Sequence, residues 1–496
     1  MKLPVQIAAA TTLALGMISC RSASADTARI EPRLAHLLAN GSGLEVHLVW
    51  VFLTDKGSAK TSPHISARSA TRRALRGKPA PVLADQPILE SYVERLRPHV
   101  TSVRQRSRWF NAVSVEATPE QIAAIIHLPM VRQLDVVTRA ARATLGASVD
   151  APSGPVTAPR TAALDYGPSL LQLQQIHVPA LHDRGLSGAG ILVAHFDNGY
   201  RLLSHEVFAT THIVATRDFI DGDVDPAPPA GTPLFWGAHG IATLSVLAGN
   251  RPGELIGAAF GADFVLARTE NDGSETPFEE DNWVAAMEWA DSLGVDVISS
   301  SVGYLDYEMP HMSWTWQHMD GNTTVITRAA DLAVARGIVV VNAAGNSGSN
   351  PLHNTLMAPA DGDSVLTVGG VQPDGQLYLS SSVGPTTSNP PRTKPDVLAR
   401  GTAVYLAGTD DPMDYGFNSG TSFSCPLVAG VVALLLDAAP QATPVEIAAA
   451  LRATASRASM PDNSYGWGIV NAEAALARLT SPVEPASMSR LKGLYR

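Results

Sequence analysis

Four polar side chains in the later part of the chain have the types that a hydrolytic site requires. Asp197 stands in VAHFDNGY, His239 in GAHGIATLSVLAGN, Asn346 in VVVNAAGNSG and Ser422 in GTSFSCPLVAG. Each alone is ordinary: a turn carboxylate, a structural histidine, a turn amide and a hydroxyl at a helix start. Together they supply a nucleophile, a base, a carboxylate that orients the base, and a donor for an oxyanion. This set predicts covalent catalysis by a serine.

The serine segment also predicts a local geometry. Ser422 begins an apolar pattern typical of a buried helix, and we place Pro426 in the first turn of that helix. Proline costs little there, because first-turn amides have no intrahelical partner. The hydroxyl would then lie at the positive end of the helix dipole, among N–H groups that can stabilise an anion.

The elements that must position these groups alternate in type. Continuous apolar strands are predicted at residues 190–196, 263–269, 295–301 and 337–343, and helices at 281–293 and 327–335. This alternation indicates a parallel sheet covered on both faces, an α/β fold. Ligands bind beyond the carboxyl ends of the strands in such sheets. Asp197 and Asn346 follow predicted strands closely, which places both near that edge.

Residues 165–475 resemble the subtilisin-like serine proteases (S8 family). The likeness rests on DNG, HGIATLSVLAG, NAAGNSG and, most specifically, GTSFSCPLVAG; SSSVGPTTSNPPRTKPDVLARG and YGWGIVNAEAAL also look like family segments. The resemblance implies a parallel-sheet catalytic domain and a serine endopeptidase that acts on protein and peptide substrates. Its residue roles would be Asp197 as the orienting acid, His239 as the general base, Asn346 as an oxyanion donor and Ser422 as the nucleophile. We predict no cofactor and no metal.

The resemblance also implies two walls of a substrate pocket. The implied substrate-binding residues are Ser301, Val302 and Gly303 on one side and Ala343, Ala344 and Gly345 on the other. An extended peptide would pair with these backbone edges as an added strand. The alternative for the first wall is a plain sheet core, because such strands are central. The long aromatic loop at 304–324 would wall the cleft or form a surface loop.

Some residues depart from the family pattern or compete with the assigned roles. Ile241, Ala242 and Leu427 replace usual family residues outside the triad. Phe423 replaces the methionine common after the nucleophile, so we expect tolerance of peroxide. The remaining competitors are two other histidines, His195 and His205, and the thiol of Cys425. We expect His239 to be the base and Cys425 to be a small buried packing residue.

The N-terminal part predicts a small α+β domain. Strand, helix, strand, helix and strand patterns follow one another at 45–53, 88–96, 109–117, 118–126 and 131–137, which suggests a ferredoxin-like sandwich. Thr118 and Gln121 have the spacing of a capping box. In position and pattern this part resembles the inhibitory propeptide of the same family. It would be an intramolecular inhibitor, a prodomain released by a cut in the linker that follows.

The first 25 residues predict an export signal, with a positive start, an apolar run and a small-residue cleavage motif. We therefore expect a secreted or cell-envelope protein. MISC also resembles a lipoprotein box, so a membrane would be a partner only if Cys20 is lipidated. The predicted organisation is a signal peptide at 1–25, a propeptide domain at 26–142, a linker at 143–164, a peptidase domain at 165–480 and a tail at 481–496.

Net charge differs between the two parts of the chain. Residues 1–160 carry 20 basic and 11 acidic side chains, a net charge of +9, and the remainder carries −19. The scattered arginines match no nucleic-acid-binding motif, so we predict no nucleic-acid partner. Complementary charge favours docking of the two parts on each other.

Two other function classes are less consistent with the sequence. A protease-like fold that has lost activity, serving as a catalytically inactive binding module, is disfavoured because all four catalytic positions are filled. A dinucleotide-binding enzyme is suggested by GLSGAG at 185–190, but those glycines precede the strand instead of following it.

Overall fold

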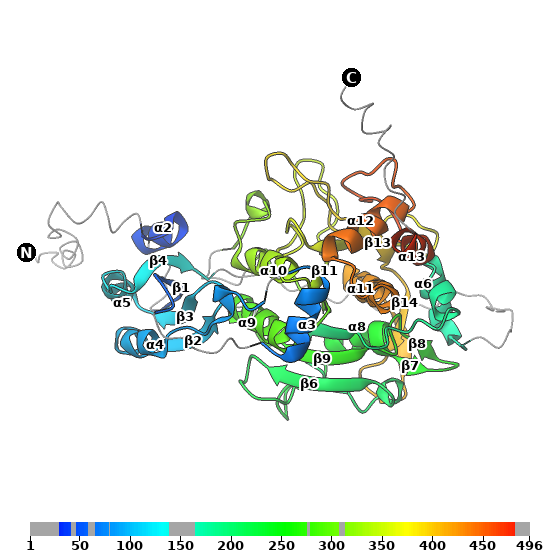
Figure 1. Cartoon of the computed structure of the whole chain (residues 1–496), viewed down its shortest axis with the longest axis horizontal. Coiled ribbons are helices and arrows are strands. Elements are labelled where there is room, and N and C mark those ends of the chain that lie inside the picture. Colours follow the sequence, from blue (N-terminus) through cyan, green and yellow to red (C-terminus); the bar gives the residue numbers. More distant parts are fainter. Residues whose placement is uncertain are drawn as a thin grey trace, which may run out of the picture. The chain divides into compact units, whose positions relative to one another are not determined.

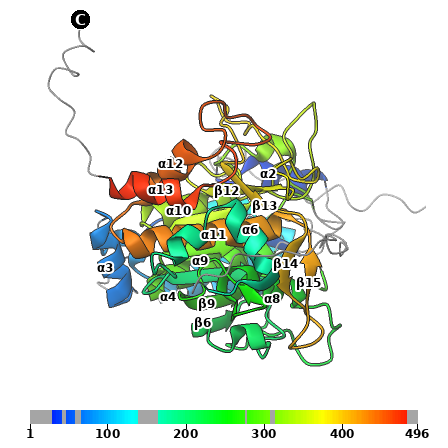
Figure 2. The same ribbon diagram turned by 90° about the vertical axis from the view of Figure 1, so that its right-hand side faces the viewer.

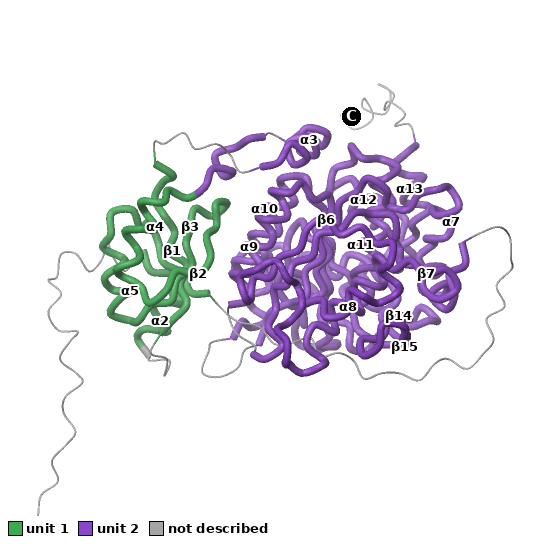
Figure 3. Tube along the Cα trace, turned by 90° about the horizontal axis from the view of Figure 1, so that it is seen from below, with its two compact units in different colours: residues 1–60, 88–137 green, residues 61–87, 138–496 purple. Residues whose placement is uncertain are grey.

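A computed structural model describes residues 29–40, 46–57, 65–78, 80–137, 164–274, 278–306 and 313–481. The predicted signal peptide with Cys20, nearly all of the linker and nearly all of the tail lie outside these described residues. The chain forms two compact units (Figure 3). Unit 1 comprises residues 1–60 and 88–137, and unit 2 comprises residues 61–87 and 138–496.

Unit 1 is a four-stranded antiparallel sheet with the strand order β2-β3-β1-β4. Its strands are β1 (His47–Leu53), β2 (Ser102–Ser107), β3 (Ala112–Ala117) and β4 (Val131–Val136), and its helices are α2 (Pro32–Asn40), α4 (Glu90–Leu96) and α5 (Pro119–Ile125). The predicted ferredoxin-like arrangement is confirmed, with one strand more than predicted. Sequence reasoning missed β2 because SVRQRS is a polar edge strand without apolar alternation. The predicted capping box of Thr118 and Gln121 begins α5.

Unit 2 is built on a seven-stranded parallel sheet with the order β13-β12-β11-β10-β5-β9-β6 (Figure 1). Its sheet strands are β5 (Leu192–Asp197), β6 (His212–Asp218), β9 (Asp263–Arg268), β10 (Val297–Ser300), β11 (Val339–Ala343), β12 (Leu366–Val371) and β13 (Val397–Arg400). The short pairs are β7 (Asn250–Arg251) with β8 (Leu255–Ile256) and β14 (Val404–Ala407) with β15 (Tyr415–Asn418). The central strands are buried throughout, which explains their continuous apolar sequences.

Helices cover the sheet of unit 2, and the predicted α/β class is confirmed. They are α3 (Ala67–Leu75), α6 (Leu170–Gln175), α7 (Pro179–His182), α8 (Ala238–Ala248), α9 (Phe278–Leu293), α10 (Val325–Ala335), α11 (Thr421–Ala438), α12 (Pro444–Thr454) and α13 (Ala472–Thr480). Helix α8 packs against α11, α11 lies on β10 to β13, and α9 packs against α10. Figure 2 shows α11 in the middle of this unit.

Helix α11 is the central helix of the core. Within the described ranges it is the one helix long and apolar enough to cross a membrane by length and composition, and it is almost entirely buried in the unit. Its apolar character therefore reflects packing on the sheet strands and on α8. Residues 61–87, which carry α3, pack with unit 2 although they lie inside the range predicted for the propeptide domain.

Candidate active site

Asp197 ends β5, an interior strand of the sheet that lies between β10 and β9, and its carboxylate is fully buried. Nδ1 of His239 lies 2.6 Å from its Oδ1. The hydroxyl of Thr243 donates to Oδ2 at 2.9 Å, and the amide of Asn198 donates to Oδ1 at 2.9 Å. A buried carboxylate with these donors is held in one orientation.

The protonation state of Asp197 follows from these contacts. Burial alone would raise its pKa, but the charges of His239 and His195 and the hydrogen bonds from His239 and the Asn198 amide hold the pKa below its ordinary value. The ionised carboxylate can only accept a hydrogen bond, so Nδ1 of His239 carries a proton and donates it. In the neutral imidazole, Nε2 then carries no proton and can act as a hydrogen-bond acceptor.

Helix α8 begins against the turn that follows β5. The amide of Gly240 donates to Oδ1 of Asn198 at 3.0 Å. A Cβ atom on Gly240 would lie 2.2 Å from the carbonyl oxygen of Gly199 and 3.2 Å from Cβ of Asp197. Only a residue without a side chain permits this approach, which brings the preceding His239 to the carboxylate.

Ser422 is the second residue of α11, at the end where backbone amides lack intrahelical partners. It is 3% exposed, and its Oγ lies 3.5 Å from the carbonyl oxygen of Ser301. The ring of the next residue, Phe423, lies 6.1 Å from the ring of His239 between centroids. The packing of α8 on α11 therefore brings the imidazole to the N-terminal end of α11, where the serine lies.

The predicted position of Pro426 is wrong. Helix α11 begins at Thr421, so Pro426 is inside the helix, in its second turn. The missing amide would have donated to the carbonyl of Ser422, four residues earlier. That carbonyl instead accepts the hydroxyl of Ser301 at 2.8 Å, so a side chain of the neighbouring segment replaces the lost hydrogen bond.

Asn346 follows Gly345, which has φ 109°. Its Oδ1 accepts the amide of Thr421 at 2.9 Å and the hydroxyl of Thr421 at 3.1 Å. This fixes which end of the side-chain amide is oxygen. Nδ2 of Asn346 points toward Gly420: a Cβ atom built on Gly420 would lie 3.6 Å from it. Among the described residues, the structure shows no acceptor for Nδ2. A donor is thus available beside the start of α11.

The two predicted pocket walls follow neighbouring parallel strands, β10 and β11. Ser301, Val302 and Gly303 come directly after β10, Ala343 ends β11, and Ala344 and Gly345 follow it. Nδ2 of Asn342 bridges the two segments by donating to the carbonyls of Val302 and Ala343 at 3.2 and 2.9 Å. The structure brings both walls together beside Asn346 and Ser422.

The chain matches the subtilase family of S8 peptidases over residues 188–468, more than half of its length. It belongs to the subtilase family. Residues 48–150 match a second family, the peptidase S8 propeptide domain of Bacteroidota. The subtilase is therefore a serine endopeptidase that carries a propeptide, as the sequence predicted.

Relatives of the subtilase agree with this assignment. Subtilisin DY of Bacillus licheniformis is 30% identical over 311 residues, which are 62% of this chain and 97% of that protein. Subtilisin of Bacillus pumilus is 29% identical over 304 residues, 61% of this chain and 97% of that protein. Subtilisin NAT of Bacillus subtilis subsp. natto is 29% identical over 306 residues, 61% of this chain and 70% of that protein.

Sequence reasoning missed one residue that lies between the two predicted walls, Met357. A Cβ atom on Gly303 would lie 3.1 Å from Cβ of Met357, and one on Gly345 would lie 2.7 Å from its sulfur. The methionine side chain therefore lies between the two walls and is 4% exposed. No local pattern signals this, because Met357 comes from a loop outside both walls.

A cavity of about 380 Å³ lies next to Asn346. Its lining includes Asp306, Trp314, Trp316, Ser347, His353 and Thr355. The loop predicted to wall the cleft supplies the first three of these residues. Residues 307–312 of that loop lie outside the described part of the chain.

The competing groups have structural contacts. His195 is fully buried, its Nδ1 lies 2.8 Å from the hydroxyl of Tyr200, and burial lowers its pKa to about 4. Nδ1 of His205 accepts the amide of Val207. Cys425 is fully buried, and burial raises the pKa of its thiol to about 12, as expected of a packing residue.

Among the described residues, no group of three or more His, Cys, Asp or Glu side chains is arranged to hold a metal ion.

Proposed function

We propose that this chain is a secreted, self-processing zymogen of a serine endopeptidase. Ser422 is its nucleophile, His239 its general base and Asp197 the residue that orients the base. The observation that carries the proposal is the buried 2.6 Å contact of Asp197 with His239, on a helix that packs against the start of α11. The family assignment supports the same chemistry.

The reaction proceeds in two halves. Nε2 of His239 takes the proton of the Ser422 hydroxyl as the serine oxygen attacks the substrate carbonyl carbon. The same imidazolium then gives the proton to the leaving amine, and the acyl-enzyme forms. Water repeats the sequence and releases the acid. General base action of this kind contributes about 10²–10⁴ in rate.

Two N–H donors hold the oxyanion of the tetrahedral intermediate. One is Nδ2 of Asn346, whose Oδ1 is occupied by Thr421. The other is the backbone amide of Ser422, in the first turn of α11, where it is also favoured by the helix dipole. Both donors are fixed by the fold before the substrate arrives, which lowers the cost of stabilising the charge.

The substrate is a protein or peptide in an extended conformation. Its backbone pairs with residues 301–303 and 343–345, and its side chain before the scissile bond points between these walls. Met357 fills part of that space, so small side chains are preferred there.

The remaining segments serve export and activation. Residues 1–25 direct export, with attachment to a membrane only if Cys20 is lipidated. Residues 26–142 form the propeptide domain, an intramolecular inhibitor, and 143–164 form the linker that the enzyme cuts to activate itself. The peptidase domain is 165–480, and 481–496 is a tail. The propeptide family match at 48–150 supports this organisation.

One substitution tests the catalytic assignment and self-processing together. Ser422→Ala should abolish peptide cleavage, labelling by a serine-directed phosphonate and the cut in the linker, which mass spectrometry of the mature N-terminus detects. Ser424→Ala is the matched control, because Ser424 lies on the same helix and its Oγ donates to the carbonyl of Arg400. It should retain all three properties.

Two outcomes would contradict the proposal. A Ser422→Ala protein that matures alone would exclude self-processing. A folded parent protein that forms no phosphonate adduct would favour the inactive binding module instead.

A further inference from the structure

An inserted segment, residues 65–87, links two parts of unit 1 but packs on unit 2. The chain before it and the chain after it, residues 1–60 and 88–137, both belong to unit 1. The segment itself contains α3 and a 3₁₀ turn at Leu83–Asp85, and α3 lies against α9 of unit 2. The propeptide is therefore tied to the catalytic unit at a point far from the linker in sequence.

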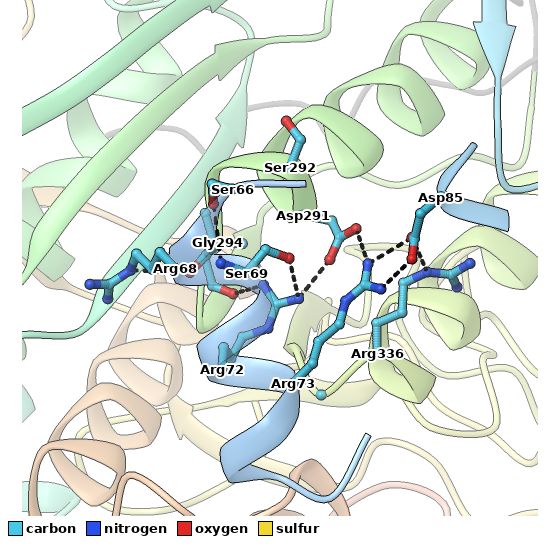
Figure 4. Close-up of polar contacts among 12 residues, drawn as sticks. Ser66, Arg68, Ser69, Arg72, Arg73, Asp85, Asp291, Ser292, Gly294 and Arg336 are labelled. Carbon is cyan, nitrogen blue, oxygen red and sulfur yellow. Dashed lines mark hydrogen bonds and ion pairs between the residues drawn. The ribbon is translucent and has the colours of Figure 1, made fainter. Parts of the chain in front are cut away.

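Helix α3 and the residues that flank it bind backbone groups at the C-terminal ends of two helices, α9 and α10; Figure 4 shows the contacts at the end of α9. The amide of Ser66 donates to the carbonyl of Ser292 at 3.0 Å, at the end of α9. The guanidinium of Arg72 donates to the carbonyl of Val295 at 2.6 Å, and that of Arg76 donates to the carbonyl of Gly337, just after α10. Carbonyls at helix C-termini carry partial negative charge, so they favour cations.

Two of the arginines share one buried carboxylate. Arg72 contacts Oδ1 of Asp291 at 2.6 Å, and Arg73 contacts Oδ2 at 2.7 Å. Arg73 also makes a two-point contact with Asp85 of the same segment, at 2.7 and 2.9 Å (Figure 4). Arg73, Asp85 and Asp291 are each 0% exposed, and Arg72 is 3% exposed. Removing one partner from such a set leaves a buried charge without compensation.

A second carboxylate extends the contact. Asp296 precedes β10, and its Oδ1 lies 2.9 Å from Arg76 while its Oδ2 lies 2.8 Å from Arg68. Arg76 is buried, whereas the side chain of Arg68 is 41% exposed. The segment thus presents a cluster of cations on one helix to acidic side chains and carbonyls of the catalytic unit.

This docking surface lies at the end of the sheet opposite to the active site. Its carbonyls and carboxylates belong to the last turn of α9 and to residues just before β10 and β11, at the amino ends of these strands. Asp197 ends β5, and the predicted pocket walls lie at the carboxyl ends of β10 and β11, which run parallel to β5. The segment therefore binds without entering the cleft, and its contacts do not depend on what the cleft holds.

We propose that the inserted segment is a retention clasp, which keeps the propeptide on the catalytic unit after the linker is cut. Cleavage of the linker then frees the chain end but does not release the propeptide. Release requires the buried arginines to leave Asp291 and Asp296. This inference depends on the proposed function in one respect only, namely that the linker is cut.

The test uses an added protease, so it does not need the chain's own activity. A recognition site for a sequence-specific protease is placed in the linker of the full-length Ser422→Ala chain, and the nicked protein is analysed by gel filtration. The two fragments should elute together at low and at high salt, because buried ion pairs are screened little. Arg72→Gln with Arg73→Gln should raise the apparent Kd between the fragments about a hundredfold.

Arg106→Gln is the matched control. Arg106 also pairs with a carboxylate, Glu90, but both side chains are exposed and lie in unit 1. This variant should retain the propeptide as the parent does. If the double variant fails to fold, Arg76→Gln provides the same comparison at Asp296, and its Kd should also rise.

Separation of the fragments in the nicked parent would overturn the clasp. Equal retention by the arginine variants and the parent, even with a lowered thermal stability, would also overturn it and leave the arginines as structural supports. Neither result bears on the catalytic role of Ser422, and loss of self-processing would leave the retention result unchanged.

Discussion

A single methyl group at residue 240 tests how the catalytic base is positioned. In Gly240→Ala the new Cβ would lie 2.2 Å from the carbonyl oxygen of Gly199, whereas ordinary van der Waals contact begins at 3.4 Å. Helix α8 and the turn after β5 must therefore move apart by about 1 Å. The 2.6 Å contact between His239 and Asp197 joins the same two segments, so it would be stretched beyond hydrogen-bond distance.

A displacement of about 1 Å at a reacting group can cost about a hundredfold in rate. We expect kcat to fall by about this factor and KM to change little, because the pocket walls follow β10 and β11. Alanine favours a helix over glycine by about 1 kcal/mol, which offsets part of the cost of the clash in stability. The folded variant should therefore be recoverable.

The assay is steady-state cleavage of a peptide amide, with thermal unfolding to show that the variant is folded. Gly416→Ala is the control, because a Cβ there meets nothing within 4 Å. Wild-type kcat in the folded Gly240→Ala protein would refute the reasoning. So would a loss confined to KM, because the base would then be correctly placed.

Three further outcomes are expected. Met357→Ala opens the space between Gly303 and Gly345, so kcat/KM for substrates with a large side chain before the scissile bond should rise about tenfold relative to small ones; no change in this ratio would remove Met357 from the pocket. Phe423→Met should make the enzyme sensitive to peroxide, measured as residual activity after exposure, whereas rapid inactivation of the parent at this position would contradict the prediction. Burial lowers the pKa of His195 from 6.5 to about 4, so the unfolded state binds more protons between these values and stability is lost as pH falls through that window, by at most about 3 kcal/mol. His195→Gln should reduce that loss in denaturant unfolding of an inactive variant, and an equal slope with pH would argue against it.

The sequence by itself was enough to predict the two folds and the family. The central strands are buried on both faces, so their apolar runs are visible without knowledge of their neighbours. Asp197 and Ser422 each stand at the end of a strand or the start of a helix, where the local pattern changes. Sequence reasoning missed the edge strand β2. Most of its side chains are partly exposed to solvent, so its sequence does not need the apolar alternation by which a half-buried strand is recognised.

Other features were decided only by tertiary structure. Pro426 was expected in the first turn, and only the fold shows that Ser301 supplies the hydrogen bond that the proline omits. Met357 enters the pocket from a separate loop. Arg72 and Arg73 of α3 form ion pairs with Asp291, which is more than 200 residues away in sequence. Hydrophobic periodicity and helix capping depend on a few neighbouring residues. They therefore indicate whether a segment is a helix or a strand and where it ends. A contact between distant segments depends on how whole elements pack, and that information is spread over the chain.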